Sequence, residues 1–548
     1  MPAINISAFK GLAPAVTPTK LIDGGAQTAI DFRVEAGSLQ PEKNSAAVGV
    51  AIPANANSIF KWKDLYWLYS TNNESFVDSP LAKDVHERLY MAGGTYPRYT
   101  TRANTSAGFD AAVGVDVVTA YRLGVPQPSA APVVNVSGAV TVGQENIIYT
   151  TTYVYTYVTQ FGEEGPASAA TDFVEYKDGQ SKNITVTAPP SGSYAFGAGA
   201  AIRIYRTATG SSTSDFLFVG QIGISATTFA DTLLDEELGE VMTSTFNFKP
   251  LDDDAAYAPD GPLKGLTAMA GGFLAGFAGK TVAFSKQYLP HAWDPANSVV
   301  TEAPIVAIKE AAFGLLVLTE TVPYLAAGST PDTMGLQKLD IDQPCVSAKS
   351  VAELAGGVIY ASPDGLVFVT SNSSQLITKG LITRDQWQQT YTPTSILGVS
   401  HENRYFAFFT TGARSACLVF DIENSEAPFV ELTLHTTAAH VSAKDDALYL
   451  LSGTALHQYG AGAAKEFTYK SKSYFLIEDT AFAWCRVICD GRPTIKVYVD
   501  GDKKSDNVVD TNIIFRLPAT MRGRELEIEI ESSTAVHSVS VATNRGEL

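Results

Sequence analysis

At 548 residues the chain is long enough for about two to four domains, and its 44 glycines, 27 prolines and scarce helix-forming runs indicate a predominantly β protein. The formal net charge of -18 argues against a surface that grips nucleic acid phosphates, since this requires clustered lysine and arginine; a protein past which nucleic acid slides is not excluded. The four cysteines are too few for a disulfide framework. The sequence shows neither a secretory signal peptide nor an apolar run of about 18 residues, so we expect a soluble chain without a membrane segment.

Residues 1–57 are predicted to form an extended N-terminal arm. Prolines and glycines, among them Pro14, Pro18, Gly24 and Pro53, interrupt each apolar group before it could form a long element. An arm of this kind is ordered only where it lies on another part of the structure.

Residues 58–126 are predicted to contain the first strands of a β-propeller. Aromatic and branched residues crowd the stretch 58–69, and a second apolar piece follows at 88–92. We therefore expect one blade that is made early in the chain. Closing the ring of blades with strands from both ends of the chain leaves no sheet edge exposed.

Residues 127–250 are expected to form an inserted immunoglobulin- or fibronectin-like β-sandwich. A linker rich in proline, alanine and serine precedes it, and residues 147–160 form a long β-branched and aromatic run that suits one pleated strand. Further strands are predicted at 183–187, 202–207, 216–222 and 227–231. The domain is an insertion because propeller-like sequence lies on both sides of it.

The main propeller blades are predicted in residues 251–465. One pattern, two apolar runs joined by a tight turn, returns five times at intervals of about 42 to 47 residues, a repeat length typical of propeller blades. The first runs of the five copies contain Phe273, Leu315, Ile359, Phe406 and Tyr449. One blade cannot bury its own faces, so successive copies indicate a ring.

Residues 466–548 are predicted to form a C-terminal β domain. One segment alternates strictly, with Leu526, Ile528 and Ile530 on the face expected to be core. The other face carries a row of four acids: Glu525, Glu527, Glu529 and Glu531. In a monomer this acidic row is simply a solvent-exposed face, whereas in a ring it is suited to line a channel.

No catalytic, cofactor-binding or metal-binding constellation is predicted. The seven histidines lack the close helical spacing of a zinc site, and Cys485 and Cys489 are interpreted as buried free cysteines. Asp252-Asp253-Asp254 lacks the alternate spacing of a calcium loop and is interpreted as a solvated linker. We expect no enzyme activity, no cofactor and no metal.

Several segments of the chain carry a family likeness. They are Phe9-Lys10-Gly11 with Pro14 and Pro18, the segments 27–32, 37–39 and 283–293, and Gln343-Pro344-Cys345-Val346-Ser347 leading to 357–365. These segments resemble tail nozzle and tail hub proteins of short-tailed bacteriophages. Residues 159–166 are similar to a segment of fibronectin-like domains in phage structural proteins. The resemblance touches most of the chain.

This resemblance implies a structural virion protein of the phage tail, made in the host cytoplasm. Nozzle subunits bear propellers, usually form a homo-hexameric ring below the portal and the adaptor (the head-to-tail connector), and contact other tail proteins or fibers. Their ring serves as the conduit and the gate for DNA ejection. Genomic DNA passes through it transiently and is not bound specifically. An acidic lumen would repel DNA phosphates. We hypothesise that the row from Glu525 to Glu531, or part of the inserted domain, faces that lumen.

Two other function classes remain open. A glycan-binding or glycan-cleaving propeller, such as a receptor-binding tail protein, would present aromatic platforms and paired acids. Ser362-Pro363-Asp364-Gly365 is only superficially similar to the aspartate turn of sialidase propellers. A secreted or surface adhesin of β domains is disfavoured by the missing signal peptide.

Overall fold

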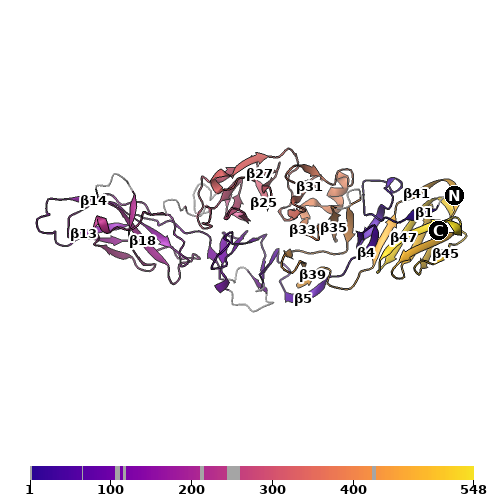
Figure 1. Cartoon of the computed structure of the whole chain (residues 1–548), viewed down its shortest axis with the longest axis horizontal. Helices are drawn as coiled ribbons and strands as arrows, with labels where there is room; N and C mark the ends of the chain where they lie inside the picture. The colour runs from indigo at the N-terminus through magenta and orange to yellow at the C-terminus, as the bar shows by residue number, and fades with distance from the viewer. Residues whose placement is uncertain are drawn as a thin grey trace.

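The computed structural model describes residues 3–63, 66–104, 112–114, 119–209, 215–243, 248, 260–422 and 427–548. The chain is nearly all β and forms three modules in a row (Figure 1). The inserted sandwich lies at one end, the propeller in the middle, and a C-terminal module at the other end, where both termini lie. The helical segments are short: η1 (Pro18–Lys20), η2 (Arg102–Asn104), η3 (Asp235–Glu237), η7 (Pro331–Thr333), η8 (Ala348–Ser350), α1 (Arg384–Gln386), η9 (Trp387–Tyr391), η10 (Pro393–Ser395) and η11 (Arg545–Glu547).

The five repeats expected from the sequence are five propeller blades, and each contains the predicted pair of strands joined by a tight turn. The repeats comprise β21 (Lys264–Met269), β22 (Phe273–Ala278), β23 (Thr281–Phe284) and β24 (Ser298–Val300); β25 (Ile305–Ala311), β26 (Gly314–Thr319), β27 (Tyr324–Ala327) and β28 (Gly335–Lys338); β29 (Ala352–Leu354), β30 (Gly357–Ser362), β31 (Gly365–Val369) and β32 (Ser374–Leu376); β33 (Leu397–His401), β34 (Arg404–Thr411), β35 (Arg414–Asp421) and β36 (Phe429–Leu432); and β37 (Ala439–Ser442), β38 (Ala447–Ser452) and β39 (Ala455–Gln458).

The early part of the propeller holds two blades, so the prediction of one early blade is wrong. The first blade consists of β6 (Ser58–Trp62), β7 (Tyr66–Ser70) and β11 (Ala112–Gly114), and the second of β8 (Ser75–Asp78), β9 (Leu89–Ala92), β10 (Arg98–Thr100) and β12 (Tyr121–Arg122). The strands β11 and β12 come from further along the chain and have three and two residues, too short to show a period in the sequence. The described residues thus form a propeller of seven sheets.

The ring closes because each blade packs its first strand against the first strand of the next. From the second blade onward, β8 contacts β21, then β21 contacts β25, β25 contacts β29, β29 contacts β33, β33 contacts β37, and β37 contacts β6. Between the first and second blades, Trp62, Leu68 and Met91 share one buried cluster. The last blade takes its fourth strand, β5 (Ala46–Ala51), from the N-terminal arm, which agrees with a ring closed from both ends of the chain.

The arm is built into the structure by strand pairing. Its strands are β1 (Ile4–Ile6), β2 (Ala26–Ile30), β3 (Phe32–Glu35), β4 (Ser38–Pro41) and β5. Strand β2 lies between β36 of the sixth blade and β40 (Phe467–Ser471) of the C-terminal module, so blade and module form one continuous ten-stranded sheet. Strands β1 and β4 both pair with β47 (Val536–Ala542) near the end of the chain.

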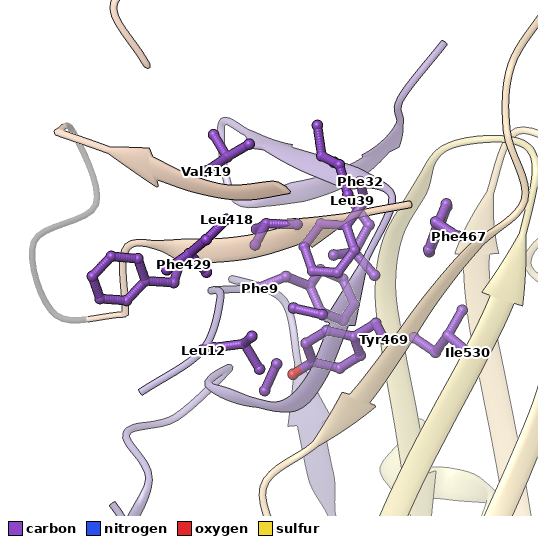
Figure 2. Close-up of a cluster of buried hydrophobic side chains, with 14 of the residues drawn as sticks. Phe9, Leu12, Phe32, Leu39, Leu418, Val419, Phe429, Phe467, Tyr469 and Ile530 are labelled. Atoms are coloured by element: carbon purple, nitrogen blue, oxygen red, sulfur yellow. The ribbon is translucent and has the colours of Figure 1, made fainter. Parts of the chain in front are cut away.

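Side chains of the arm fill the junction between propeller and C-terminal module (Figure 2). Phe9 is 1% exposed and its ring meets that of Tyr469 edge-on, with centroids 5.0 Å apart. Phe32 approaches Phe467 in the same way at 5.8 Å, and Leu418 of β35 faces them from the blade. Three distant parts of the sequence therefore share one core.

Two buried acids of the arm add ion pairs across the same region. Asp31 accepts hydrogen bonds from Lys465 Nζ at 3.0 Å and from the Thr433 backbone N–H at 2.9 Å. Glu42 accepts from Arg404 at 2.5 Å and from the Tyr459 hydroxyl at 2.6 Å. Buried acids are stable only when paired in this way.

The inserted module is a sandwich as expected, but the run 147–160 forms two strands. They are β14 (Tyr149–Thr151), which pairs with β16 (Val174–Tyr176), and β15 (Tyr153–Val158), which pairs with β18 (Ala201–Thr207). The chain crosses between sheets at Thr152, whose N–H donates to Thr207 Oγ1 at 3.1 Å. The remaining strands are β13 (Val133–Ser137), β17 (Ser181–Thr185), β19 (Phe216–Gly223) and β20 (Thr228–Asp231).

The C-terminal module packs two sheets face to face. One contains β42 (Trp484–Cys489), β45 (Ile514–Arg516) and β47 with β1, β3 and β4. The other contains β40, β41 (Tyr474–Ala481), β43 (Thr494–Val499), β44 (Asp502–Val508) and β46 (Arg522–Ser532) with β2. Their inner side chains belong to the same hydrophobic cluster as the blade that β2 joins.

Candidate functional site

The predicted alternation on β46 is confirmed. Leu526, Ile528 and Ile530 are fully buried in the module core. The four glutamates point to the opposite face, where Glu527 is 9% exposed and the others are half-buried.

The acidic row is not bare, because neighbouring strands bring lysines against it. Lys470 of β40 lies 2.7 Å from Glu527, and Lys496 of β43 lies 3.0 Å from Glu529 and 2.5 Å from Glu531. The hydrogen bond to Glu531 is the largest of the effects that hold the pKa of Lys496 above its usual value. Glu525 accepts a hydrogen bond from the Ser473 hydroxyl.

Sequence reasoning missed these lysines because cross-strand pairing was needed to find them. Lys470 and Lys496 each occupy the position directly opposite Glu529, on either side of β46. Opposite charges placed in this way stabilise a sheet. The local signal was the alternation Thr494, Lys496, Tyr498, which runs in the same period as the glutamates.

The centre of the propeller contains a channel between the first strands of the blades. A cavity of about 730 Å³ is lined by residues 72–77, 264–267 and 305–309 together with Ala348 and Val351. A second cavity of about 230 Å³ shares Ala348 and Val351 and is lined by residues of β6, β33 and β37. Together the two cavities contact six of the seven blades and the segment that leads into the fifth.

One lysine bridges this channel. Lys349 Nζ in η8, ahead of the fifth blade, donates 2.9 Å to the carbonyl oxygen of Asn57, which precedes the first blade. These blades are not neighbours in the ring, so the side chain reaches across the axis. A lysine spans roughly 6 Å from Cα to Nζ, whereas the major groove of a DNA duplex alone is about 12 Å wide. The propeller channel is therefore too narrow for duplex DNA.

The inserted sandwich is held against the propeller by a buried ionic cluster. Glu163, in the turn after β15, lies 3.4 Å from Arg88 of the second blade and accepts a hydrogen bond from the Tyr99 hydroxyl at 3.0 Å. Arg88 also pairs with Asp84 at 3.2 Å. His291 of the third blade lies 3.8 Å from Glu163, and burial lowers its pKa. The sandwich thus contacts the second blade through buried charged groups and the third blade through a buried histidine.

The cysteines and acids singled out from the sequence give no chemical site. All four cysteines are buried and free, as predicted for Cys485 and Cys489, and burial raises the pKa of Cys345 and Cys485 to about 12. The residues that the structure describes contain no group of three or more potential metal ligands. Asp252-Asp253-Asp254 lies outside the described residues. Asp364 forms an ion pair with Arg384 at 2.9 Å, as expected for a structural turn.

No helix in the described part of the chain is long and apolar enough to cross a membrane.

No family model matches the chain, and no curated protein matches it. Among solved structures, Kluyvelomyces marxianus Hsv2 matches with a TM-score of 0.25 and 11% identity over 47% of this chain and 71% of its own. The exo-beta-1,3-galactanase of Phanerochaete chrysosporium matches with a TM-score of 0.20 and 9% identity over 50% of this chain and 95% of its own. Citrobacter koseri AztD matches with a TM-score of 0.25 and 8% identity over 70% of this chain and 99% of its own. Similarities of this size carry no argument about function.

Proposed function

We propose that this protein is a structural, non-enzymatic subunit of a short-tailed bacteriophage tail, a nozzle or hub subunit. It assembles into a homo-hexameric ring below the head-to-tail connector, contacts other tail proteins or fibers, and forms conduit and gate for DNA ejection. The observation that supports this best is the ten-stranded sheet in which β2 of the arm joins a propeller blade to the C-terminal module.

That sheet makes the two modules one stiff body. Domains joined only by a linker move against each other unless their interface is large and hydrophobic. Here the interface is a common core around Phe9, Phe32 and Tyr469, crossed by backbone hydrogen bonds. A subunit that holds a conduit open while DNA passes needs this stiffness, whereas a catalytic domain does not.

The bridged propeller channel decides where DNA would travel in such a ring. Because Lys349 crosses the axis of the propeller, the duplex passes between subunits, along the axis of the ring. The net charge of -18 then suits a wall that repels phosphates at close range. We retain the proposal that the row from Glu525 to Glu531 or part of the inserted sandwich faces this passage.

Replacing the four glutamates of the row would test that placement poorly, since Lys470 and Lys496 would be left without their partners. A sharper pair of variants is Lys470→Gln with Lys496→Gln, which makes the face more acidic, and Glu529→Lys with Glu531→Lys, which leaves four lysines against two glutamates and makes it basic. If the row lines the conduit, DNA ejection slows in virions with the basic variant and not in those with the acidic one. Equal ejection rates in virions with the unchanged protein and with either variant would show that the row does not line the conduit.

The proposal as a whole is tested by locating the protein. Purified virions of the phage are probed with antibodies against the inserted sandwich and viewed by electron microscopy, and particles from a host that supplies no such protein are compared. We expect labelling at the tail, and DNA-filled heads without complete tails when the protein is missing. Its absence from virions, or complete tails without it, would overturn the proposal.

A glycan-binding propeller is the second candidate, favoured by the channel cavity. Its volume of about 730 Å³ is that of a typical small-molecule site, and Asn72 and Asn73 offer amide groups suited to sugar hydroxyls. Glu74, the carboxylate in its lining, is bound by Arg98 at 3.1 Å, so the lining residues supply no pair of acids for hydrolysis. Saturable binding of host-surface glycan, weakened by Asn72→Ala, would favour this candidate.

A further inference from the structure

We infer that copies of this chain join head to tail by pairing two open sheet edges of the C-terminal module, strand β41 of one copy against strand β44 of the next. The inference deepens the proposed function, on whose ring-forming subunit it rests, by naming the contact between subunits.

Both strands leave an edge uncovered in the same sheet. Within the residues that the structure describes, β44 pairs only with β43, and β41 pairs only with the first half of β46. The second half of β46 pairs on that side with β40, which β2 covers in turn. Open edges present unpaired N–H and C=O groups and are templates for pairing with another chain.

The strand directions allow the sheet to continue from one copy to the next. Strands β41 and β43 are both antiparallel to β46, and β44 is antiparallel to β43. It follows that β44 and β41 run in opposite directions. A second copy in the same orientation can therefore place its β41 beside β44 of the first copy as an antiparallel neighbour. Strand direction then continues to alternate across the two copies.

Exposed apolar side chains mark these two edges. Phe475 and Ile477 of β41 are 66% and 91% exposed, and Val508 of β44 is 59% exposed. Phe475 is paired with Glu525, and Val508 is paired with Thr494, which is opposite Glu531. Paired residues share a face, so Phe475 and Val508 both lie on the face of the acidic row, at opposite edges of it.

The register that brings Phe475 opposite Val508 forms one pair of opposite charges, while Ile477 lies opposite Asp506. Counted along antiparallel strands, Phe475 opposite Val508 places Asp479 opposite Lys504. The present partners of these charges, Arg522 and Asp502, form solvent-exposed pairs, which are weak and exchange readily. Glu478 adds a further negative charge to the β41 edge.

The same register shifts one copy along the strands relative to the next. Phe475 lies level with Glu525 of β46, whereas Val508 lies level with Glu531, further along the same strand. A closed arrangement of strands requires such a stagger, because the strands must tilt against the axis. Head-to-tail contacts of this kind generate rings when the rotation closes.

Cysteine trapping in the full chain tests the contact. The four native cysteines are buried, so the double variant Phe475→Cys/Val508→Cys supplies the exposed thiols. We expect mild oxidation to give a ladder of disulfide-linked oligomers on a non-reducing gel. Phe475→Cys alone and Val508→Cys alone should stay monomeric. The matched control is Val142→Cys/Phe173→Cys in the inserted sandwich, where both positions are at least as exposed, and it should give no ladder.

The outcomes separate this inference from the proposed function. Rings that form without any disulfide ladder, or dimers of Phe475→Cys alone, overturn the β41–β44 contact and leave the nozzle proposal to the virion experiment. A ladder from a protein that is absent from virions supports the contact and overturns the nozzle. A further check compares Phe475→Asp with Phe173→Asp, because both side chains are exposed and neither change disturbs a core. We expect the fraction of protein in rings to fall at least tenfold more for Phe475→Asp.

Discussion

Removing the ring of Phe9 is expected to uncouple the C-terminal module from the propeller. Phe9 is 1% exposed and packs edge-on against Tyr469 at 5.0 Å, in the core that the arm shares with both modules (Figure 2). Large-to-small substitution of a buried phenylalanine costs about 3–5 kcal/mol. Because Phe9 lies where the arm joins the two modules, this loss weakens the joint before it weakens the blades.

The assay is calorimetry of the full chain together with hydrogen exchange. For Phe9→Ala we expect a transition of the C-terminal module that separates from that of the propeller and moves to lower temperature, with faster exchange in β2 and β40. Phe173→Ala is the matched control, since that ring is 79% exposed, and it should change neither. A Phe9→Ala protein that loses less than about 1 kcal/mol and keeps β2 protected would refute the idea that the arm couples the modules.

Three further predictions concern charged groups. Burial lowers the pKa of His440 from 6.5 to about 4, so the unfolded chain takes up this proton first as pH falls; stability should drop by about 3 kcal/mol between pH 6.5 and 4, and His440→Phe should flatten that part of a urea-melting pH profile. Lys496→Met leaves Glu531 without its 2.5 Å partner and should lower stability by about 1 kcal/mol, an effect that high salt reduces; an unchanged melting temperature at low salt would contradict it. Asp231→Asn breaks a fully buried pair with Arg206 at 3.0 Å and should destabilise the inserted sandwich by about 3–5 kcal/mol in calorimetry, while the other transitions keep their temperatures.

Patterns with a local physical cause could be predicted without the structure. The blade repeat depends on turns and apolar runs close in sequence, which is why the strands around Phe273 to Tyr449 were recognised. The alternation at Leu526, Ile528 and Ile530 is equally local, since side chains of a strand alternate between two faces. The burial of Cys485 and Cys489 was predicted because free cysteine behaves like a small hydrophobic residue.

Features that depend on distant partners could not be predicted. Strands β11 and β12 are too short for any period and exist because earlier strands offer them an edge. The arm has no pattern of its own, yet β2 and β5 complete sheets whose other strands lie hundreds of residues away. The charge of the acidic row is partly neutralised by Lys470 and Lys496, which lie beside it only because of the cross-strand register.

The amino-acid sequence by itself thus determined the β class, the blade repeat and the two faces of β46, because each depends on backbone periodicity over a few residues. Tertiary structure alone decided that seven sheets form the ring, that Lys349 bridges its axis, and that the arm fuses propeller and C-terminal module. The physical reason is that strand edges and buried charges pair with whichever partner the fold brings within hydrogen-bond distance. These partners cannot be identified from their separation in the sequence.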